Sequence, residues 1–266
     1  SSLVHTGDTD TKISFASNTI KFDTDTSERC RIDSSGRLLV GHTVVRAVAG
    51  HSPRLQIQGT EHNSQTFGII ANSADAIAAT FQMSKQRSGA AGGDTIVQNG
   101  DNIANLVFTA GDGTNLDSIA AQISVKIDGT PGVNDTPGRM MFFTTPDGAQ
   151  AGVERMRIDS SGKVGIGDTA PDALLSIKGD SNEASNPSIR LKDGTDAREA
   201  WITNNSGDLM LANGGNDNVY HSRIRLMDGK QINFDIDGSN ALNIDSSRNA
   251  TFAGTITAGG ADFAGL

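Results

Sequence analysis

The 266-residue chain contains 31 glycines but only one tryptophan and one tyrosine, and 36% of its residues are hydrophobic. Bulky side chains are too few to fill a wide core, so the composition favours short strands joined by polar turns. The net charge is −9 with no cluster of lysine or arginine, which argues against nucleic-acid binding. No apolar run approaches the roughly 18 residues of a membrane span, so no membrane insertion is expected.

A repeated segment organises the chain. It reads ERCRIDSSGRLLVG at Glu28–Gly41, ERMRIDSSGKVGIG at Glu154–Gly167 and, in a weaker form, ALNIDSSRNATFAG at Ala241–Gly254. The first and third copies also share what precedes them, because Ile20–Ser35 aligns without a gap on Ile232–Ser247. Internal repeats of this kind indicate a structural unit that occurs more than once.

Each copy predicts a short strand, a polar turn and a second short strand. Aspartate and serine can hydrogen-bond their own backbone two residues on, and glycine accepts the positive φ that closes such a turn. In the third copy Arg248 stands where the others have glycine, so its turn is expected to differ. The predicted turn-forming residues are Asp33, Gly36, Asp159, Gly162 and Asp245.

The strand before each turn carries an equivalent apolar position, occupied by Cys30, Met156 and Leu242 in the three copies. Interchangeable apolar residues indicate a packed interior position, so the thiol of Cys30 is expected to be buried and unreactive. As the single cysteine, it also excludes a disulfide within one chain. The predicted core positions are Cys30, Ile32, Met156, Ile158, Leu242 and Ile244.

The pattern changes between the first two repeats. Short apolar runs separated by Gly- and Asp-containing turns predict a small β-sandwich-like module. The composition of Ala74–Lys85 would also suit a helix, but Thr80, Phe81 and the flanking turns favour a strand. The strands expected in this part are Phe67–Ala71, Ala78–Ser84, Thr95–Gln98, Ile103–Thr109, Ile119–Ile127 and Arg139–Thr144.

The predicted fold class is all-β. Single-faced short strands cannot bury both sides of a sheet alone, and three chains wound around one axis would cover each other. A monomeric β-solenoid is the alternative. The expected parts are an N-terminal β stem with the first repeat (1–59), a globular β module (60–153), a second stem repeat (154–180), a β-rich segment of unclear type (181–240) and a C-terminal Gly-rich β repeat (241–266).

The stretch ERMRIDSSGKVGIGDTAPDALLSIKG resembles the repeated signature of phage tail fibres and tail spikes, especially those of marine and cyanobacterial phages. Residues 94–148 resemble a module common in these proteins, and ATFAGTITAGGADFAG is similar to the Gly-rich repeats of fibre shafts. The resemblance implies an elongated, intertwined homotrimer. It implies a location in the virion tail, on the extracellular surface, with other phage tail proteins and a host cell-surface glycan or receptor as partners.

Two rival functions stay open. The first is a tail spike that depolymerises host polysaccharide, which would need two close carboxylates in a groove lined by aromatic rings. The second is a tail connector or fibrous adhesin without receptor binding. Aromatic residues are scarce, so the best candidates for glycan contact are Trp201, Asn204 and Tyr220, for which capping of a local core is the alternative role.

No catalytic residue, metal ligand set or cofactor is predicted. The sequence has no nucleophile elbow, phosphate loop or His-Glu-Xaa-Xaa-His motif, and its five histidines are not spaced as metal ligands. The acidic pairs Asp23/Asp25 and Asp235/Asp237 could coordinate calcium, but they lack the full spacing of a calcium loop. The chain is therefore expected to be structural and adhesive rather than enzymatic.

Overall fold

The computed structural model describes residues 1–179, 188–192, 199–205, 208–214, 220–227, 231–236 and 239–254. The chain divides into two compact units, Ser1–Ser161 and Gly162–Leu266. The described residues form three β-sheets and one short 3₁₀ turn, η1 (His62–Ser64). Among them there is no helix long and apolar enough to cross a membrane.

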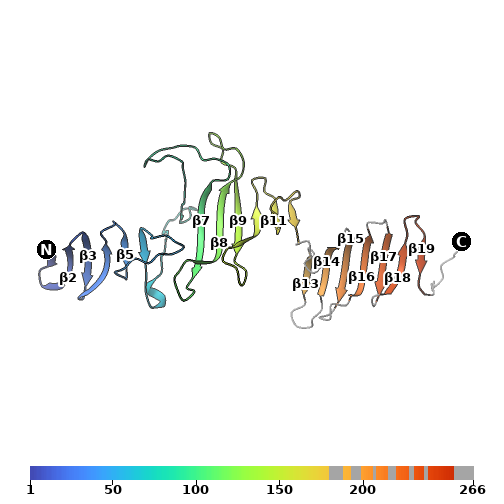
Figure 1. Cartoon of the computed structure of the whole chain (residues 1–266), viewed down its shortest axis with the longest axis horizontal. Coiled ribbons are helices and arrows are strands. Elements are labelled where there is room, and N and C mark those ends of the chain that lie inside the picture. The colour runs from blue at the N-terminus through green and yellow to red at the C-terminus, as the bar shows by residue number, and fades with distance from the viewer. Residues whose placement is uncertain are drawn as a thin grey trace. The chain divides into compact units, whose positions relative to one another are not determined.

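The first sheet has six strands in sequence order, and Figure 1 shows it toward the N-terminus. Its neighbours are antiparallel except for the last pair, which is parallel. Ile13, Phe15, Ile20 and Phe22 alternate with polar residues in the sequence, and all four lie in strands of this sheet. The strands are β1 (Ser2–His5), β2 (Asp8–Ala16), β3 (Thr19–Thr24), β4 (Ser27–Ile32), β5 (Leu38–Val40) and β6 (Leu55–Ile57).

A long segment without strand or helix follows η1. Residues 65–101 make no sheet pairing with the described residues, and every residue of 65–85 is exposed. Figure 1 shows this stretch as a wide loop before β7. The strands expected at Phe67–Ala71, Ala78–Ser84 and Thr95–Gln98 therefore do not form within a single chain, and neither does a helix at Ala74–Lys85.

The second sheet has the order β12-β11-β10-β9-β8-β7, so β7 lies at its edge. The strands expected from 103, 119 and 139 onward are confirmed, but they belong to one layer. The predicted β-sandwich over 60–153 does not form within one chain, because the apolar residues of its first half are not in a sheet that could cover the second half. The strands are β7 (Asn102–Ala110), β8 (Ser118–Ile127), β9 (Gly138–Thr144), β10 (Val153–Ile158), β11 (Val164–Ile166) and β12 (Leu175–Ile177).

The third sheet gives the segment of unclear type a definite form. It is an antiparallel meander of seven strands in sequence order, which Figure 1 shows toward the C-terminus. Each strand pairs with the one that follows it. The strands are β13 (Ser188–Lys192), β14 (Glu199–Asn205), β15 (Asp208–Gly214), β16 (Tyr220–Met227), β17 (Gln231–Ile236), β18 (Ser239–Ile244) and β19 (Ala250–Phe252).

The sequence repeat corresponds to a repeated set of strands. The segment before the turn is β4, β10 or β18, and in each case the register with the preceding strand shifts by one residue at the same place. The extra residue is Arg29, Arg155 or Ala241. Such a bulge increases the local twist of a strand. In the first two copies the bulged arginine donates from Nε to a threonine Oγ1, over 2.6 Å to Thr24 and 2.9 Å to Thr144.

The polar turn is the same in the first and third copies, which contradicts the expectation from Arg248. Asp33 Oδ1 accepts hydrogen bonds from the N–H groups of Ser35 and Arg37. In the same way, Asp245 Oδ1 accepts hydrogen bonds from the N–H groups of Ser247 and Asn249. Gly36 has φ +72° and Arg248 has φ +71°. Arg248 therefore adopts the left-handed conformation that glycine would take without steric cost.

A second glycine of the repeat is required by space as well as by φ. Gly41 and Gly167 end the motif, with φ of +79° and +68°. A Cβ on either would lie 2.2 Å from a backbone oxygen, that of Gln58 or Lys178, on the parallel strand segment alongside. Gly162 differs, because its Cβ would meet nothing within 4 Å. Of these four positions, only Gly36 and Gly162 were predicted from the sequence.

Several of the most buried residues lie on the polar side of the sheets. Leu39, Ser124, Met141 and Met210 are each 4% exposed or less. Their cross-strand partners are polar, since Leu39 pairs with Arg31 on β4 and Met210 with Arg225 on β16. The faces that carry the larger apolar side chains are the exposed ones.

Candidate interaction surface

One face of the first sheet is apolar across all six strands. Two cross-strand rows form it, and neighbouring members of a row face each other directly in the register. The rows are Leu3, Ile13, Phe22, Cys30, Val40 and Ile57, and Phe15, Ile20, Ile32, Leu38 and Leu55. Phe15 is 44% exposed and Leu55 is 50% exposed, so no layer of the described residues covers this face.

The second sheet repeats this arrangement. Its two rows run from β7 to β10 and consist of Leu106, Ile123, Phe142 and Met156, and of Ala104, Val125, Met140 and Ile158. Leu106 is 43% exposed, and Phe108, farther along β7, is 54% exposed. A face of this composition is typical of a surface that another molecule covers.

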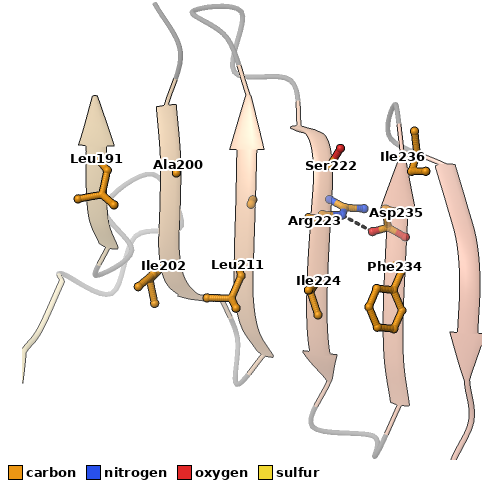
Figure 2. A pocket seen from close by; sticks show the side chains of 11 residues that line it. Leu191, Ala200, Ile202, Leu211, Ser222, Arg223, Ile224, Phe234, Asp235 and Ile236 are labelled. Atoms are coloured by element: carbon orange, nitrogen blue, oxygen red, sulfur yellow. Dashed lines mark hydrogen bonds and ion pairs between the residues drawn. The ribbon is translucent and has the colours of Figure 1, made fainter. Parts of the chain in front are cut away.

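The third sheet has the longest apolar row, with one residue from each of seven strands. It consists of Ile189, Ile202, Leu211, Ile224, Phe234, Leu242 and Phe252. Figure 2 shows Ile202, Leu211, Ile224 and Phe234 at one level across four neighbouring strands. Together with Leu191 and other neighbours they line a shallow apolar hollow of about 560 Å³.

Five of the six predicted core positions lie in these rows, and the sixth, Ile244, pairs with Ile232 on β17 and Ala250 on β19. Within them each residue of the variable position stands opposite a phenylalanine: Cys30 opposite Phe22, Met156 opposite Phe142 and Leu242 opposite Phe234. In the single chain they are only half-buried, and Ile32 and Ile158 are 38% and 36% exposed. Their burial in an assembly therefore stays a prediction.

The polar face is paired within the chain. Arg31 donates from Nη2 to Glu28 Oε2 at 2.7 Å, and Arg157 makes the same contact with Glu154 at 2.8 Å. The guanidinium of Arg31 lowers the pKa of Glu28 by hydrogen bonding. Because the charges of the polar face are already paired, this face does not need a binding partner. The apolar face, in contrast, is not covered by any other described residues.

The third sheet has a buried ion pair on its own polar face. Asp235, which is 4% exposed, binds the guanidinium of Arg223 on the neighbouring strand (Figure 2). Arg225 reaches Asp208 at 3.0 Å. Removing one partner of a buried pair leaves an uncompensated charge, so these contacts hold adjacent strands in register.

The described residues offer no cluster of three or more His, Cys, Asp or Glu side chains that could hold a metal ion. Of the acidic pairs considered for calcium, Asp23 accepts a hydrogen bond from Ser14 Oγ at 3.1 Å and Asp235 is bound to Arg223. Asp237 lies outside the described residues.

The glycan-contact candidates lie on strands of the third sheet. By backbone register Trp201 pairs with Ala212, Asn204 with Leu209 and Tyr220 with Gly214. Their side chains lie outside the described residues, so a role in glycan contact stays a prediction.

The sequence analysis missed the part of the second repeat that precedes the motif. Met140 and Phe142 take the places of Ile20 and Phe22, but the number of residues to the variable position differs. Phe142 precedes Met156 by 156 − 142 = 14 residues, whereas Phe22 precedes Cys30 by 30 − 22 = 8. The longer connection between β9 and β10 hides the equivalence. Two bulky apolar residues at alternate positions before the motif were the available signal.

No protein-family model and no curated protein sequence matches the chain. Among solved structures, the chain is similar to the carboxy-terminal domain of the bacteriophage T5 L-shaped tail fibre, with 12% identity and a TM-score of 0.38 over 73% of this chain and 92% of that one. It is equally similar to the same domain solved with its intramolecular chaperone domain, again with 12% identity and a TM-score of 0.38. That match covers 73% of this chain and 63% of the longer one.

Proposed function

We propose that the chain is a segment of a phage tail fibre that assembles as a homotrimer and takes part in attachment to the host surface. The observation that supports this most is that each of the three sheets is one layer thick and exposes a continuous apolar face. The repeated RIDSSG signature, which resembles that of tail fibres, points to the same class of protein.

Burial of these faces would supply the driving force for assembly. Covering a large apolar side chain that is half exposed stabilises the assembly by about 1 kcal/mol, because each Å² of buried apolar surface contributes about 25 cal/mol. Each sheet contributes several such residues, for example Leu211, Ile236 and Phe252 in the third. Three copies around one axis bring three such faces together and leave the paired charges of the opposite faces in water.

The oligomeric state is tested by light scattering on a sizing column. We expect a mass about three times that of the chain, and we expect the apolar rows to be protected from a hydrophobic fluorescent dye. A stable monomer that does not bind such a dye would contradict the proposal, because it would mean that the chain covers its own apolar faces.

Host attachment is tested by competition. Purified protein, added in excess to susceptible cells, is expected to reduce adsorption of the phage that carries this fibre, since three weak sites on one trimer can engage together. A trimer that leaves adsorption unchanged would favour a structural connector instead. A denatured sample of the same protein is the matched control.

We further propose that attachment is non-enzymatic. Incubation with polysaccharide from the host envelope is expected to release no reducing ends above a heat-treated control. Release that increases with protein concentration would instead support the tail spike that depolymerises host glycan.

A further inference from the structure

We propose that residues 65–85 form an exchanged arm that pairs as a β-strand with the free edge of β7 in a neighbouring copy of the chain. The inference rests on the proposed trimer, and it goes further by naming the segments that two copies share. When identical copies exchange an element, the unpaired strand and the unpaired sheet edge both gain backbone hydrogen-bond partners, without any change of sequence.

The arm has the pattern of a strand but makes no strand contacts. Ile77, Ala79, Phe81 and Met83 alternate with Ala78, Thr80, Gln82 and Ser84. Ile77 is 74% exposed and Phe81 is 64% exposed, although period-two alternation normally marks a half-buried strand. The main chain of this run makes local side-chain bonds, from Ile77 N–H to Asp75 Oδ1 and from Thr80 Oγ1 to the Ala78 oxygen, but no backbone–backbone bond to the described residues. Backbone groups without partners are tolerated only while water reaches them.

The arm cannot satisfy itself. Its earlier run, around Phe67 and Ile69, lies beside Ala79 and Phe81, and the four side chains line a shallow hollow with Thr80. The two runs nevertheless share no sheet pairing, since neither is assigned to a strand. Side-chain proximity without a hydrogen-bonded ladder leaves both runs able to add to another sheet edge.

The second sheet offers a matching edge. β7 pairs with β8 on one side only, and its nine residues include the exposed apolar side chains Leu106 and Phe108. Unpaired edges that are long and apolar are templates for strand addition, and β7 has neither a proline nor a lysine that would block it. This edge also borders the apolar face that the proposed trimer buries, so a neighbouring copy is already adjacent to it.

One end of the arm is held firmly in place. Arg87 makes a bidentate contact with Asp101, at 2.7 and 2.8 Å, and Lys85 lies 3.4 Å from the same carboxylate. The Arg87 guanidinium, with the Gln98 N–H, lowers the pKa of Asp101 well below its usual range. The arm therefore departs from a fixed point next to the start of β7, and yet in the single chain it leaves this edge uncovered.

Hydrogen exchange tests whether the arm is paired in the assembled protein. Amides of residues 77–84 are expected to exchange at least about 100-fold more slowly than unprotected backbone, as in a hydrogen-bonded ladder. β8 is the internal protected reference, and the same protein unfolded in denaturant is the unprotected one. Fast exchange of the arm in a protein of trimeric mass would overturn the exchanged arm while leaving the trimer intact.

Cross-linking decides which copy supplies the edge. In a Cys30→Ala background, whose native mass is checked first, one preparation carries Thr80→Cys and a second carries Val107→Cys on β7. The two are unfolded together, refolded as a mixture and treated with a short bis-maleimide. Because no chain carries both cysteines, a peptide linking 80 to 107 can form only between copies, and we expect it in the mixed sample.

The controls separate the possible failures. Each single variant treated alone should lack the 80–107 peptide. A double variant that links 80 to 107 only within one chain, while the mixture gives no link, would show that the arm folds onto its own β7 and would overturn the exchange. A monomeric mass of the background protein would instead overturn the proposed trimer.

Discussion

The first two repeats and the third differ in their polar residues but not in their backbone. The pair Glu28 and Arg31 of the first copy corresponds to Asn240 and Asn243 in the third, and Arg248 replaces a glycine. The third copy keeps the bulge, the aspartate-centred turn and the apolar residue opposite a phenylalanine. In place of the ion pair, Asn243 donates to Asn233 on the adjacent strand, at 2.5 Å.

This comparison separates what the repeat requires from what it tolerates. The apolar rows and the side chain of the turn aspartate recur in every copy, so they define the unit. The charged pair is replaced by amides in the third copy, where Asn243 bonds the neighbouring strand β17 instead.

The apolar position is expected to be the most sensitive. Met156→Asp would place a carboxylate in each of three copies on the face proposed to be buried, at a cost of several kcal/mol per unpaired charge. Loss of the trimeric mass on a sizing column is the expected result. Ala149→Asp, in an exposed turn of the same sheet, is the control that adds equal charge. A soluble trimer of Met156→Asp would contradict the placement of this row.

Gly167 should tolerate substitution less than Gly162, although both have positive φ. Gly162→Ala adds only the conformational cost, about 1 kcal/mol. In Gly167→Ala the new Cβ also meets the Lys178 oxygen at 2.2 Å, so the strands must separate and we expect a loss of more than about 2 kcal/mol. Thermal unfolding of the two variants side by side provides the measurement. Equal melting temperatures would show that the two backbone segments at Gly167 and Lys178 can separate without cost.

Arg248 offers the reverse substitution. Arg248→Gly should stabilise the third copy by up to about 1 kcal/mol, because glycine takes φ near +71° without steric strain. Gly36→Arg should destabilise the first copy by a similar amount. Denaturant midpoints of both variants test this pair, and a destabilised Arg248→Gly would indicate that the arginine side chain makes a contact that outweighs its backbone strain.

The charged pair predicts a small dependence on pH. The hydrogen bond from Arg31 is the main reason why the pKa of Glu28 in the folded state lies below its ordinary value of 4.5. A carboxyl pKa that is lower in the folded state stabilises the fold at pH values above the unfolded-state pKa. This stabilisation is lost as the pH falls from about 4.5 through the folded-state pKa. Glu28→Gln should therefore cost less than about 1 kcal/mol at pH 7 and reduce the acid sensitivity of unfolding. Asn240→Gln, at the neutral equivalent position, should leave the pH profile unchanged.

Much of the local structure could be predicted from the sequence. The strand, turn and strand of each repeat follow from the IDSS motif, and the strands Leu55–Ile57 and Leu175–Ile177 follow from alternating residues after it, although alternation does not show that they pair in parallel. These signals are local, since a side chain that bonds its own backbone and a period of two act within a few residues.

Other features depended on residues distant in sequence. Nothing near Gly41 indicates that the Gln58 oxygen will approach it, because that contact arises only when β5 and β6 pair in parallel. Arg248 was expected to change its turn, but the backbone bonds to Asp245 outweigh the cost of its positive φ.

Short alternating strands, repeated turns and one apolar face per strand can be recognised in the amino-acid sequence. The number of layers that those strands make depends on contacts between residues far apart in the chain. A sandwich was expected over 60–153, but residues 65–101 form no second sheet and the apolar rows of all three sheets are left exposed. Alternation states which side of a strand is apolar, whereas the surface that covers that side is chosen by long-range pairing, within a chain or between chains.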